Sequence, residues 1–181
     1  MDSLYARYAG AMFALAEEEK KIEDYRLEFK KLKTVFLENE ELIRLLSSYF
    51  LESEEKDGII DRVFFDADPL TRNFLKVVSQ NRRMDCIVRI IDEFVGRCDE
   101  SLGILEGTVY SFRALDETEM ARLSDALSAR LNSRVELTNS VDPHLLGGVK
   151  IIVGDRIFDG SVKNKLEKMK DTLLSGGYNG D

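Results

Sequence analysis

The spacing of apolar residues changes once along this chain, near Gly103, and this change constrains the fold more than any other feature. Before Gly103, apolar side chains recur every three or four positions, as at Tyr8, Met12 and Leu15, which is the period of an amphipathic helix. After it, apolar and polar residues alternate through residues 105–112, which is the period of a strand. The sequence therefore predicts two domains with a boundary near Gly103.

Residues 1–103 predict an all-α bundle of about six helices joined by short loops. Asp68 followed by Pro69 marks one helix start, because proline at the first helical position loses no hydrogen bond and aspartate accepts from free amides. A last helix is expected over residues 84–99 and would contain both cysteines, Cys86 and Cys98, as reduced and partly buried thiols. Its inward stripe would be Ile87, Ile90, Ile91, Phe94 and Val95.

Residues 104–175 predict a small α+β domain. A capping box at Asp116 and Glu119 would start a helix, and a strand over residues 135–141 would follow. The inner stripe of that helix would be Met120, Leu123, Leu127 and Leu131.

A hairpin and a final helix complete the predicted second domain. Strands over residues 149–153 and 156–158 would join at Gly154 and Asp155, since glycine supplies the freedom that a tight turn needs. The glycine-rich residues 176–181 would form a flexible tail. The final helix would start at Asp159, Gly160 and Ser161, with Val162, Leu166, Met169 and Leu173 on one face.

Charge and hydropathy exclude two classes of protein. The net charge of −8 and the pI of about 4.9 argue against a chain whose main work is to neutralise nucleic-acid phosphates. No apolar run reaches the roughly 20 residues that cross a bilayer, and the first residues lack the basic, serine-rich character of a transit peptide. We expect no nucleic-acid partner and no direct membrane insertion.

Groups that could form a catalytic or metal site are scarce. His144 is the single histidine, and the cysteines have no metal-ligand spacing. The pair Gly147 and Gly148 lacks the lysine and the helix that follow a phosphate-binding loop, so we expect a kink, a bulge or a close backbone approach there. The sequence predicts no catalysis, no cofactor and no metal.

Small residues in the first predicted helix indicate a binding surface instead. Ala6, Ala9, Gly10 and Ala11 would leave a shallow apolar surface on which another helix could lie.

Three segments carry a resemblance to a known family. They are YARYAGAMFALA at residues 5–16, NFLKVVSQNRRM at residues 73–84, and VELTNSVDPHLLGGVKIIVGDRIFDGSVKNKLEKM at residues 135–169. Together they resemble the delta subunit of bacterial F-type ATP synthases and its mitochondrial relative, the oligomycin-sensitivity-conferring protein. A proline often found before the first-helix tyrosine in that family is absent here, where Arg7 directly precedes Tyr8.

The resemblance implies a non-catalytic stator subunit at the cytoplasmic face of a bacterial plasma membrane. It would link the catalytic head to the peripheral stalk and resist torque during ATP synthesis. The helical domain would bind the N-terminal helix of an alpha subunit in a groove between its first and fifth helices. The matching positions are Tyr8, Ala11, Met12, Leu15, Phe74, Val77, Val78 and Asn81.

The same resemblance implies that the second domain holds the C-terminal ends of the stalk b subunits. Its signature positions are Leu146, Gly147, Gly148, Gly154, Asp155, Asp159, Gly160 and Ser161. Two alternatives stay open from the sequence. One is an unrelated two-domain adaptor that binds another amphipathic helix, and the less favoured one is an enzyme with an unrecognised carboxylate site.

Overall fold

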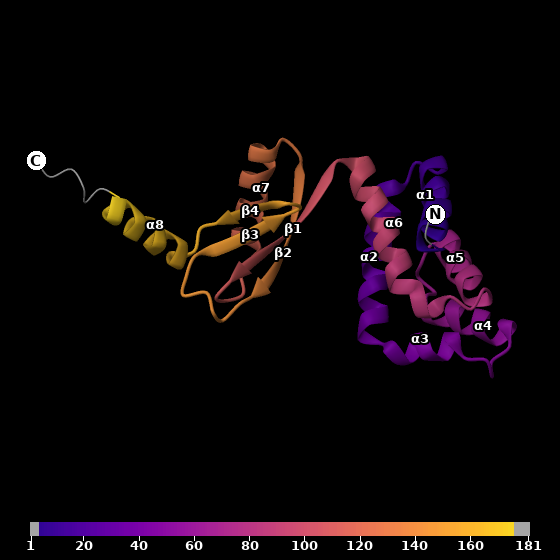
Figure 1. Ribbon diagram of the computed structural model, residues 1–181. Helices are drawn as coiled ribbons and strands as arrows, with labels where there is room; N and C mark the ends of the chain where they lie inside the picture. Colours follow the sequence, from indigo (N-terminus) through magenta and orange to yellow (C-terminus); the bar gives the residue numbers. More distant parts are fainter. Residues whose placement is uncertain (1–3, 176–181) are drawn as a thin grey trace, which may run out of the picture. The chain divides into compact units, whose positions relative to one another are not determined.

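The computed structural model describes residues 4–175, which fall into two compact units (Figure 1). The chain divides between Leu102 and Gly103. The first unit is built from helices, and the second combines helices with a four-stranded mixed sheet. The predicted order, with helices first and mixed structure second, is confirmed. The tail over residues 176–181 lies outside the described residues.

The first unit follows the predicted helical spacing closely. Asp68 caps the fifth helix by accepting from the amide of Leu70 at 2.8 Å, with Pro69 at the first helical position. The elements are α1 Leu4–Glu18, α2 Ile22–Glu38, α3 Glu40–Ser47, α4 Ser53–Val63, α5 Pro69–Gln80, the 3₁₀ turn η1 Met84–Cys86, and α6 Ile87–Leu102.

The expected helix over residues 84–99 begins differently. Residues Met84–Cys86 form a 3₁₀ turn, so Cys86 lies in that turn and only Cys98 lies in α6, and the prediction that one helix contains both is wrong. The chain leaves α5 through Arg82, whose φ of 57° is left-handed, and the tight turn reverses its direction before α6. Both cysteines are free, and burial raises the pKa of the Cys98 thiol to about 12.

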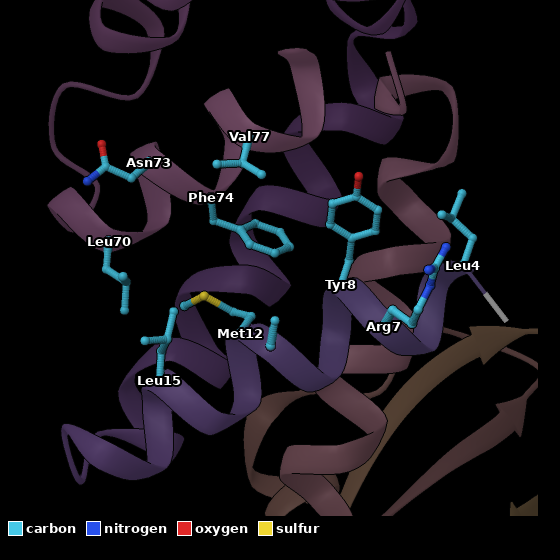
Figure 2. A pocket seen from close by; sticks show the side chains of 10 residues that line it. Leu4, Arg7, Tyr8, Met12, Leu15, Leu70, Asn73, Phe74 and Val77 are labelled. Atoms are coloured by element: carbon cyan, nitrogen blue, oxygen red, sulfur yellow. The ribbon is translucent and has the colours of Figure 1, made fainter. Parts of the chain in front are cut away.

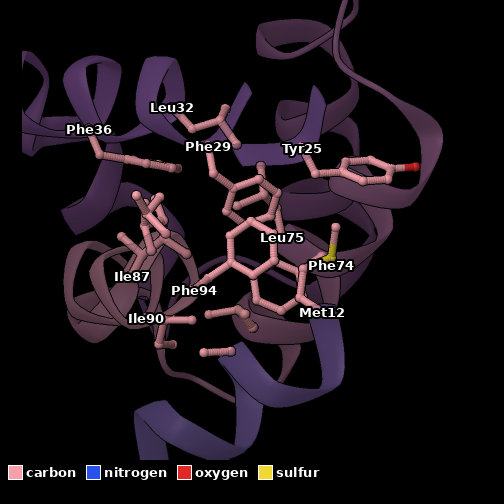
Figure 3. Packing of buried hydrophobic residues seen from close by; sticks show 14 of the residues in the cluster. Met12, Tyr25, Phe29, Leu32, Phe36, Phe74, Leu75, Ile87, Ile90 and Phe94 are labelled. Carbon is pink, nitrogen blue, oxygen red and sulfur yellow. The ribbon is translucent and has the colours of Figure 1, made fainter. Parts of the chain in front are cut away.

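Aromatic side chains form the centre of the first unit (Figure 3). The ring centroid of Phe29 on α2 lies 4.4 Å from that of Phe94 on α6 and 5.6 Å from that of Phe74 on α5, in tilted geometry. Met12 of α1 belongs to the same cluster and is fully buried. The core therefore joins the first two helices of the chain to α5 and α6.

Two ion pairs join α2 to α6. Arg26 Nε donates to Asp99 Oδ1 where both side chains are nearly inaccessible, with exposed fractions of 0% and 11%. One heptad further along each helix, Lys33 Nζ lies 2.6 Å from Asp92 Oδ1 in a pair that is 39% and 49% exposed. The residue numbers rise on α2 as they fall on α6, so the two helices run antiparallel.

We predict that Asp99→Asn lowers the free energy of unfolding by about 3–5 kcal/mol, because the buried Arg26 charge then loses its carboxylate. The matched control is Asp92→Asn, which removes the exposed partner of Lys33 and should cost less than about 1 kcal/mol. Urea unfolding followed by circular dichroism measures both. If both variants lost the same free energy of unfolding, the stronger effect that we assign to the buried ion pair would be contradicted.

The second unit contains one sheet with the strand order β2-β1-β3-β4. β1 pairs in parallel with β2, with Val109 opposite Asn139, and antiparallel with β3, with Val109 opposite Ile151. α7 connects β1 to β2 and packs its inner stripe on the sheet, as the expected positions predict. The bounds are β1 Ile104–Ser111, α7 Glu117–Leu131, β2 Arg134–Val141, β3 Val149–Val153, β4 Arg156–Asp159 and α8 Val162–Ser175.

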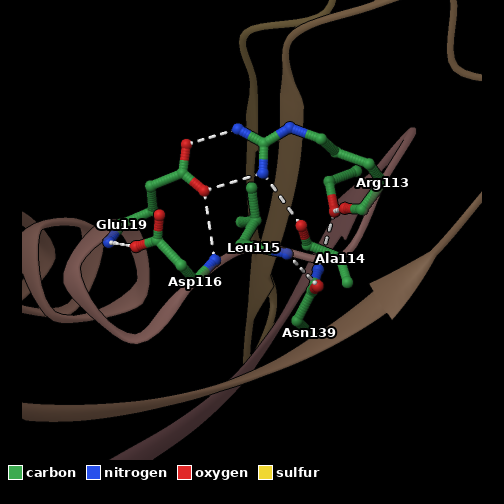
Figure 4. A network of polar contacts seen from close by, with 7 residues as sticks. Arg113, Ala114, Leu115, Asp116, Glu119 and Asn139 are labelled. Atoms are coloured by element: carbon green, nitrogen blue, oxygen red, sulfur yellow. Dashed lines mark hydrogen bonds and ion pairs between the residues drawn. The ribbon is translucent and has the colours of Figure 1, made fainter.

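The predicted capping box at the start of α7 is present (Figure 4). Asp116 Oδ1 accepts from the Glu119 amide at 2.8 Å, and Glu119 Oε2 accepts from the Asp116 amide at 3.1 Å. Arg113 holds the same Glu119 carboxylate with two donors, at 2.9 and 2.6 Å, and this hydrogen bonding lowers the pKa of Glu119. Asn139 of β2 accepts from the Leu115 amide at 2.9 Å, which fixes the loop against the sheet.

Candidate functional site

An apolar groove runs along the surface of the first unit between α1 and α5 (Figure 2). Its volume is about 480 Å³. Met12, which is fully buried, and Phe74, which is 9% exposed, form its floor, while Leu15 and Val77 are 40% and 47% exposed on its sides. The residues that line it are Leu4, Arg7, Tyr8, Ala11, Met12, Leu15, Leu70, Asn73, Phe74 and Val77.

The position of the small residues on α1 explains part of this shape. Ala11 lines the groove, and its short side chain takes up little of the space between the two helices. The other small residues do not line it, contrary to expectation: Ala9 is fully buried in the core, and a Cβ at Gly10 would lie 3.5 Å from Arg97 of α6. Successive positions on a helix point about 100° apart, so a run of small residues cannot all face one partner.

Six of the eight positions proposed for the groove line it, namely Tyr8, Ala11, Met12, Leu15, Phe74 and Val77. Val78 is fully buried in the core instead, and Asn81 uses its side-chain amide to donate to the Val77 carbonyl at 2.8 Å. Sequence reasoning missed Leu4, Arg7, Leu70 and Asn73, although Leu4 and Leu70 extend the same helical spacing by one turn on each helix.

The glycine pair before β3 lies against the start of α8. Gly148 has a φ of +78°, and a Cβ there would lie 2.4 Å from the Gly160 carbonyl oxygen. The Gly147 carbonyl accepts from the Val162 amide at 3.0 Å. The pair therefore allows the expected close backbone approach, and the space it leaves is filled by backbone.

The Asp159, Gly160 and Ser161 segment ends β4 and starts α8. Asp159 Oδ1 accepts from the Ser161 amide at 2.9 Å, and Ser161 Oγ accepts from the Asn164 amide at 3.2 Å. Hydrogen bonding from the Ser161 side chain and amide lowers the pKa of Asp159. These signature positions thus fix where α8 begins.

Apolar side chains on α8 face outward. Val162, Leu166 and Met169 are 40%, 57% and 61% exposed, and Leu146 in the loop before β3 is 82% exposed. The side chain of Leu173, expected on the same face, is not described. Gly154 and Asp155 form the exposed two-residue turn of the hairpin, where Gly154 has a φ of +53°.

Within residues 4–175, histidine, cysteine and carboxylate side chains form no cluster that could hold a metal ion. Across the same residues no helix is both long and apolar enough to cross a membrane. His144 is an exposed turn residue whose amide donates to Asp142 Oδ1 at 2.9 Å.

Residues 4–173 match the family model described as "ATP synthase delta (OSCP) subunit". The chain belongs to this family. A relative from Oceanobacillus iheyensis named ATP synthase subunit delta is 35% identical over 170 residues, which cover 93% of this chain and 94% of the relative. A relative of the same name from a Geobacillus strain is 34% identical over 169 residues, covering 93% and 95%.

The fold agrees with this membership. A chain in the cryo-EM structure of the Toxoplasma gondii mitochondrial ATP synthase hexamer superposes with a TM-score of 0.67 and 17% identity, covering 96% of this chain and 98% of that one. The family assignment excludes the unrelated adaptor. This family member is a stator-type subunit of the F-type ATP synthase.

We predict that Gly148→Ala destabilises the second unit by more than about 2 kcal/mol, because a Cβ there adds a backbone clash to an unfavourable φ. Gly154→Ala is the matched control: its φ is also positive, but nothing lies within 4 Å of the new Cβ, so the cost should stay near about 1 kcal/mol. Thermal unfolding of both variants gives the comparison. Similar losses would show that the contact with Gly160 is unimportant.

Proposed function

We propose that the groove between α1 and α5 binds the N-terminal helix of an alpha subunit of the catalytic head, and that the second unit holds the C-terminal ends of the stalk b subunits. The single observation that carries the first part is the open apolar groove along the two helices. Folded proteins in water rarely expose a continuous apolar strip of this kind unless it is a binding site.

The dimensions of the groove suit a helix. Its lining residues on α1 extend from Leu4 to Leu15, which corresponds to about 16 Å at 1.5 Å per residue, or about three turns of a partner helix. A partner could bury apolar residues at positions i, i+4 and i+7 along this length. The short side chain of Ala11 would then leave room for a large side chain in the middle of the contact.

The mechanical role explains why such a contact is needed. Rotation of the central shaft would carry the catalytic head with it unless the head were fixed to the stator. A dissociation constant in the nanomolar range corresponds to a binding free energy of about 12 kcal/mol. Several modest apolar contacts in one groove can add up to that free energy. The chain would act by holding two partners, without making a covalent bond.

We predict that Ala11→Asp weakens binding of a synthetic alpha-subunit N-terminal peptide at least about tenfold, because docking would bury a carboxylate among apolar side chains. The control is Ala14→Asp, which places the same charge on an exposed α1 position outside the groove lining. Calorimetric titration measures both, and circular dichroism checks that α-helix content is kept. If Ala14→Asp weakened binding as much as Ala11→Asp, the groove assignment would be withdrawn.

For the second unit, the outward apolar face of α8 supports the stalk assignment. Leu166 and Met169 lie one turn apart and are more than half exposed, which is typical of a face covered by another helix in an assembly. The exposed Leu146 lies in the loop that precedes β3. We propose that these side chains contact the C-terminal segments of the b subunits.

Replacing both Leu166 and Met169 with Gln should weaken binding of a soluble b-subunit fragment at least about tenfold and leave alpha-peptide binding unchanged. The control replaces Lys165 and Glu167 with Gln, which changes two exposed α8 positions at constant net charge. Surface plasmon resonance with each immobilised partner separates the two activities. Loss of alpha-peptide binding in the first variant would contradict the division of roles between the units.

We also propose the cellular setting implied by this function. As a peripheral part of the complex, the chain would lie at the cytoplasmic face of a bacterial plasma membrane. The bacterial relatives and the absence of a membrane-spanning helix among residues 4–175 support this position.

A further inference from the structure

The two ends of the groove differ in charge, and we propose that this difference selects its occupant. The occupant is an amphipathic helix with basic side chains at the end that lies by Leu15 and Leu70, and with carboxylates at the end that lies by Arg7. This inference rests on the proposed function of the groove and specifies the chemistry of the helix that it binds.

The end of the groove at Leu15 and Leu70 is acidic. Three consecutive exposed glutamates follow Leu15 at residues 17–19, the last of them just after the end of α1. Glu18 follows Leu15 by three positions, so both lie on the same side of the helix. The Tyr25 hydroxyl lies 2.7 Å from Glu19 Oε2 and 3.1 Å from Asp68 Oδ1. The carboxylate just after α1 and the one that caps α5 therefore meet at one hydroxyl.

Other charges at this end do not reverse its sign. Lys21 Nζ lies 3.4 Å from Glu19 Oε2 in an exposed ion pair, and Lys20 follows Glu19 directly. Asp66 adds a further exposed carboxylate just before the start of α5. Burial raises the pKa of Tyr25 above its usual range, and the hydrogen bonds to Glu19 and Asp68 add to this rise.

The opposite end of the groove is basic. Arg7 lines it and is exposed. α5 ends at Gln80, one turn past Val77, and Asn81, Arg82 and Arg83 follow it directly, all exposed. The Arg82 guanidinium lies over the Tyr49 ring at 4.8 Å, a contact that keeps its positive charge, and Asp85 is the nearest carboxylate along the chain.

Helix dipoles do not compete with these side chains. Leu15 lies beside Leu70 and Tyr8 lies near Val77, so α1 and α5 run in opposite directions along the groove (Figure 2). The positive end of each macrodipole therefore lies beside the negative end of the other, and the two cancel. The polarity of the groove is set by Arg7 and the arginines after α5 at one end, and by the carboxylates at the other.

Two synthetic helical peptides of equal composition test this inference on the full chain. Both carry the same apolar face, and their lysines and glutamates differ only in order. In the polarised peptide lysines occupy one end and glutamates the other, and in the mixed peptide they alternate. We expect the polarised peptide to bind about tenfold tighter at low salt, since each end contributes about threefold and the two factors multiply. This advantage should disappear in high salt.

Arg7→Glu reverses the charge of the arginine that lines the basic end of the groove, where Arg82 and Arg83 remain, and should reduce the advantage of the polarised peptide severalfold. Arg122→Glu makes the same change of charge at an exposed position of α7 and should preserve the advantage. Calorimetric titration of each peptide against each variant supplies the affinities. Ala11→Asp should weaken both peptides alike, which locates them in the groove.

The outcomes separate this inference from the proposed function. If both peptides bind with equal affinity and respond equally to salt, the polarity inference is overturned while the groove assignment stands. If neither these peptides nor the alpha-subunit peptide binds, the proposed function itself is overturned. Retention of the full polarised advantage in Arg7→Glu would also overturn the inference.

Discussion

The packing of Phe29 against Phe94 and Phe74 is the contact on which the first unit depends. It joins α2, α5 and α6, and Met12 of α1 completes the same cluster. Met12 and Phe74 also form the floor of the groove, so the surface offered to a partner is the outer side of the hydrophobic core. A core packed this tightly holds the two walls of the groove at a fixed distance, and a rigid groove binds a helix with less loss of entropy than a mobile one.

Backbone packing has the corresponding role in the second unit. Gly148, just before β3, lets the backbone approach Gly160, and the hydrogen bond from the Val162 amide to the Gly147 carbonyl then sets the start of α8. The apolar side of α8 remains outside the small core formed by α7 and the sheet. Both units thus follow one scheme, in which a compact core presents an uncovered apolar surface on helices.

This scheme suits a protein whose task is to hold partners together under load. Apolar surfaces supply affinity, because binding removes them from water. Charges at the margins of these surfaces set the orientation and the register of the bound partner. The charged ends of the α1–α5 groove fit that division, with Arg7 at one end and Glu18 near the other. A connector of this kind needs no catalytic group, because its function depends on the shape and charge of the surfaces that bind its partners.

The sequence by itself determined the features that are local. The change of period at Gly103, the Asp68 and Pro69 cap, the Asp116 and Glu119 capping box and the Gly154 turn each depend on neighbouring residues, and each is present. Only the tertiary structure decided which apolar positions are covered. Val77 lies on the groove wall and Val78 in the core, although the family resemblance implied that both line the groove. Which of them is covered depends on the helices that pack around α5.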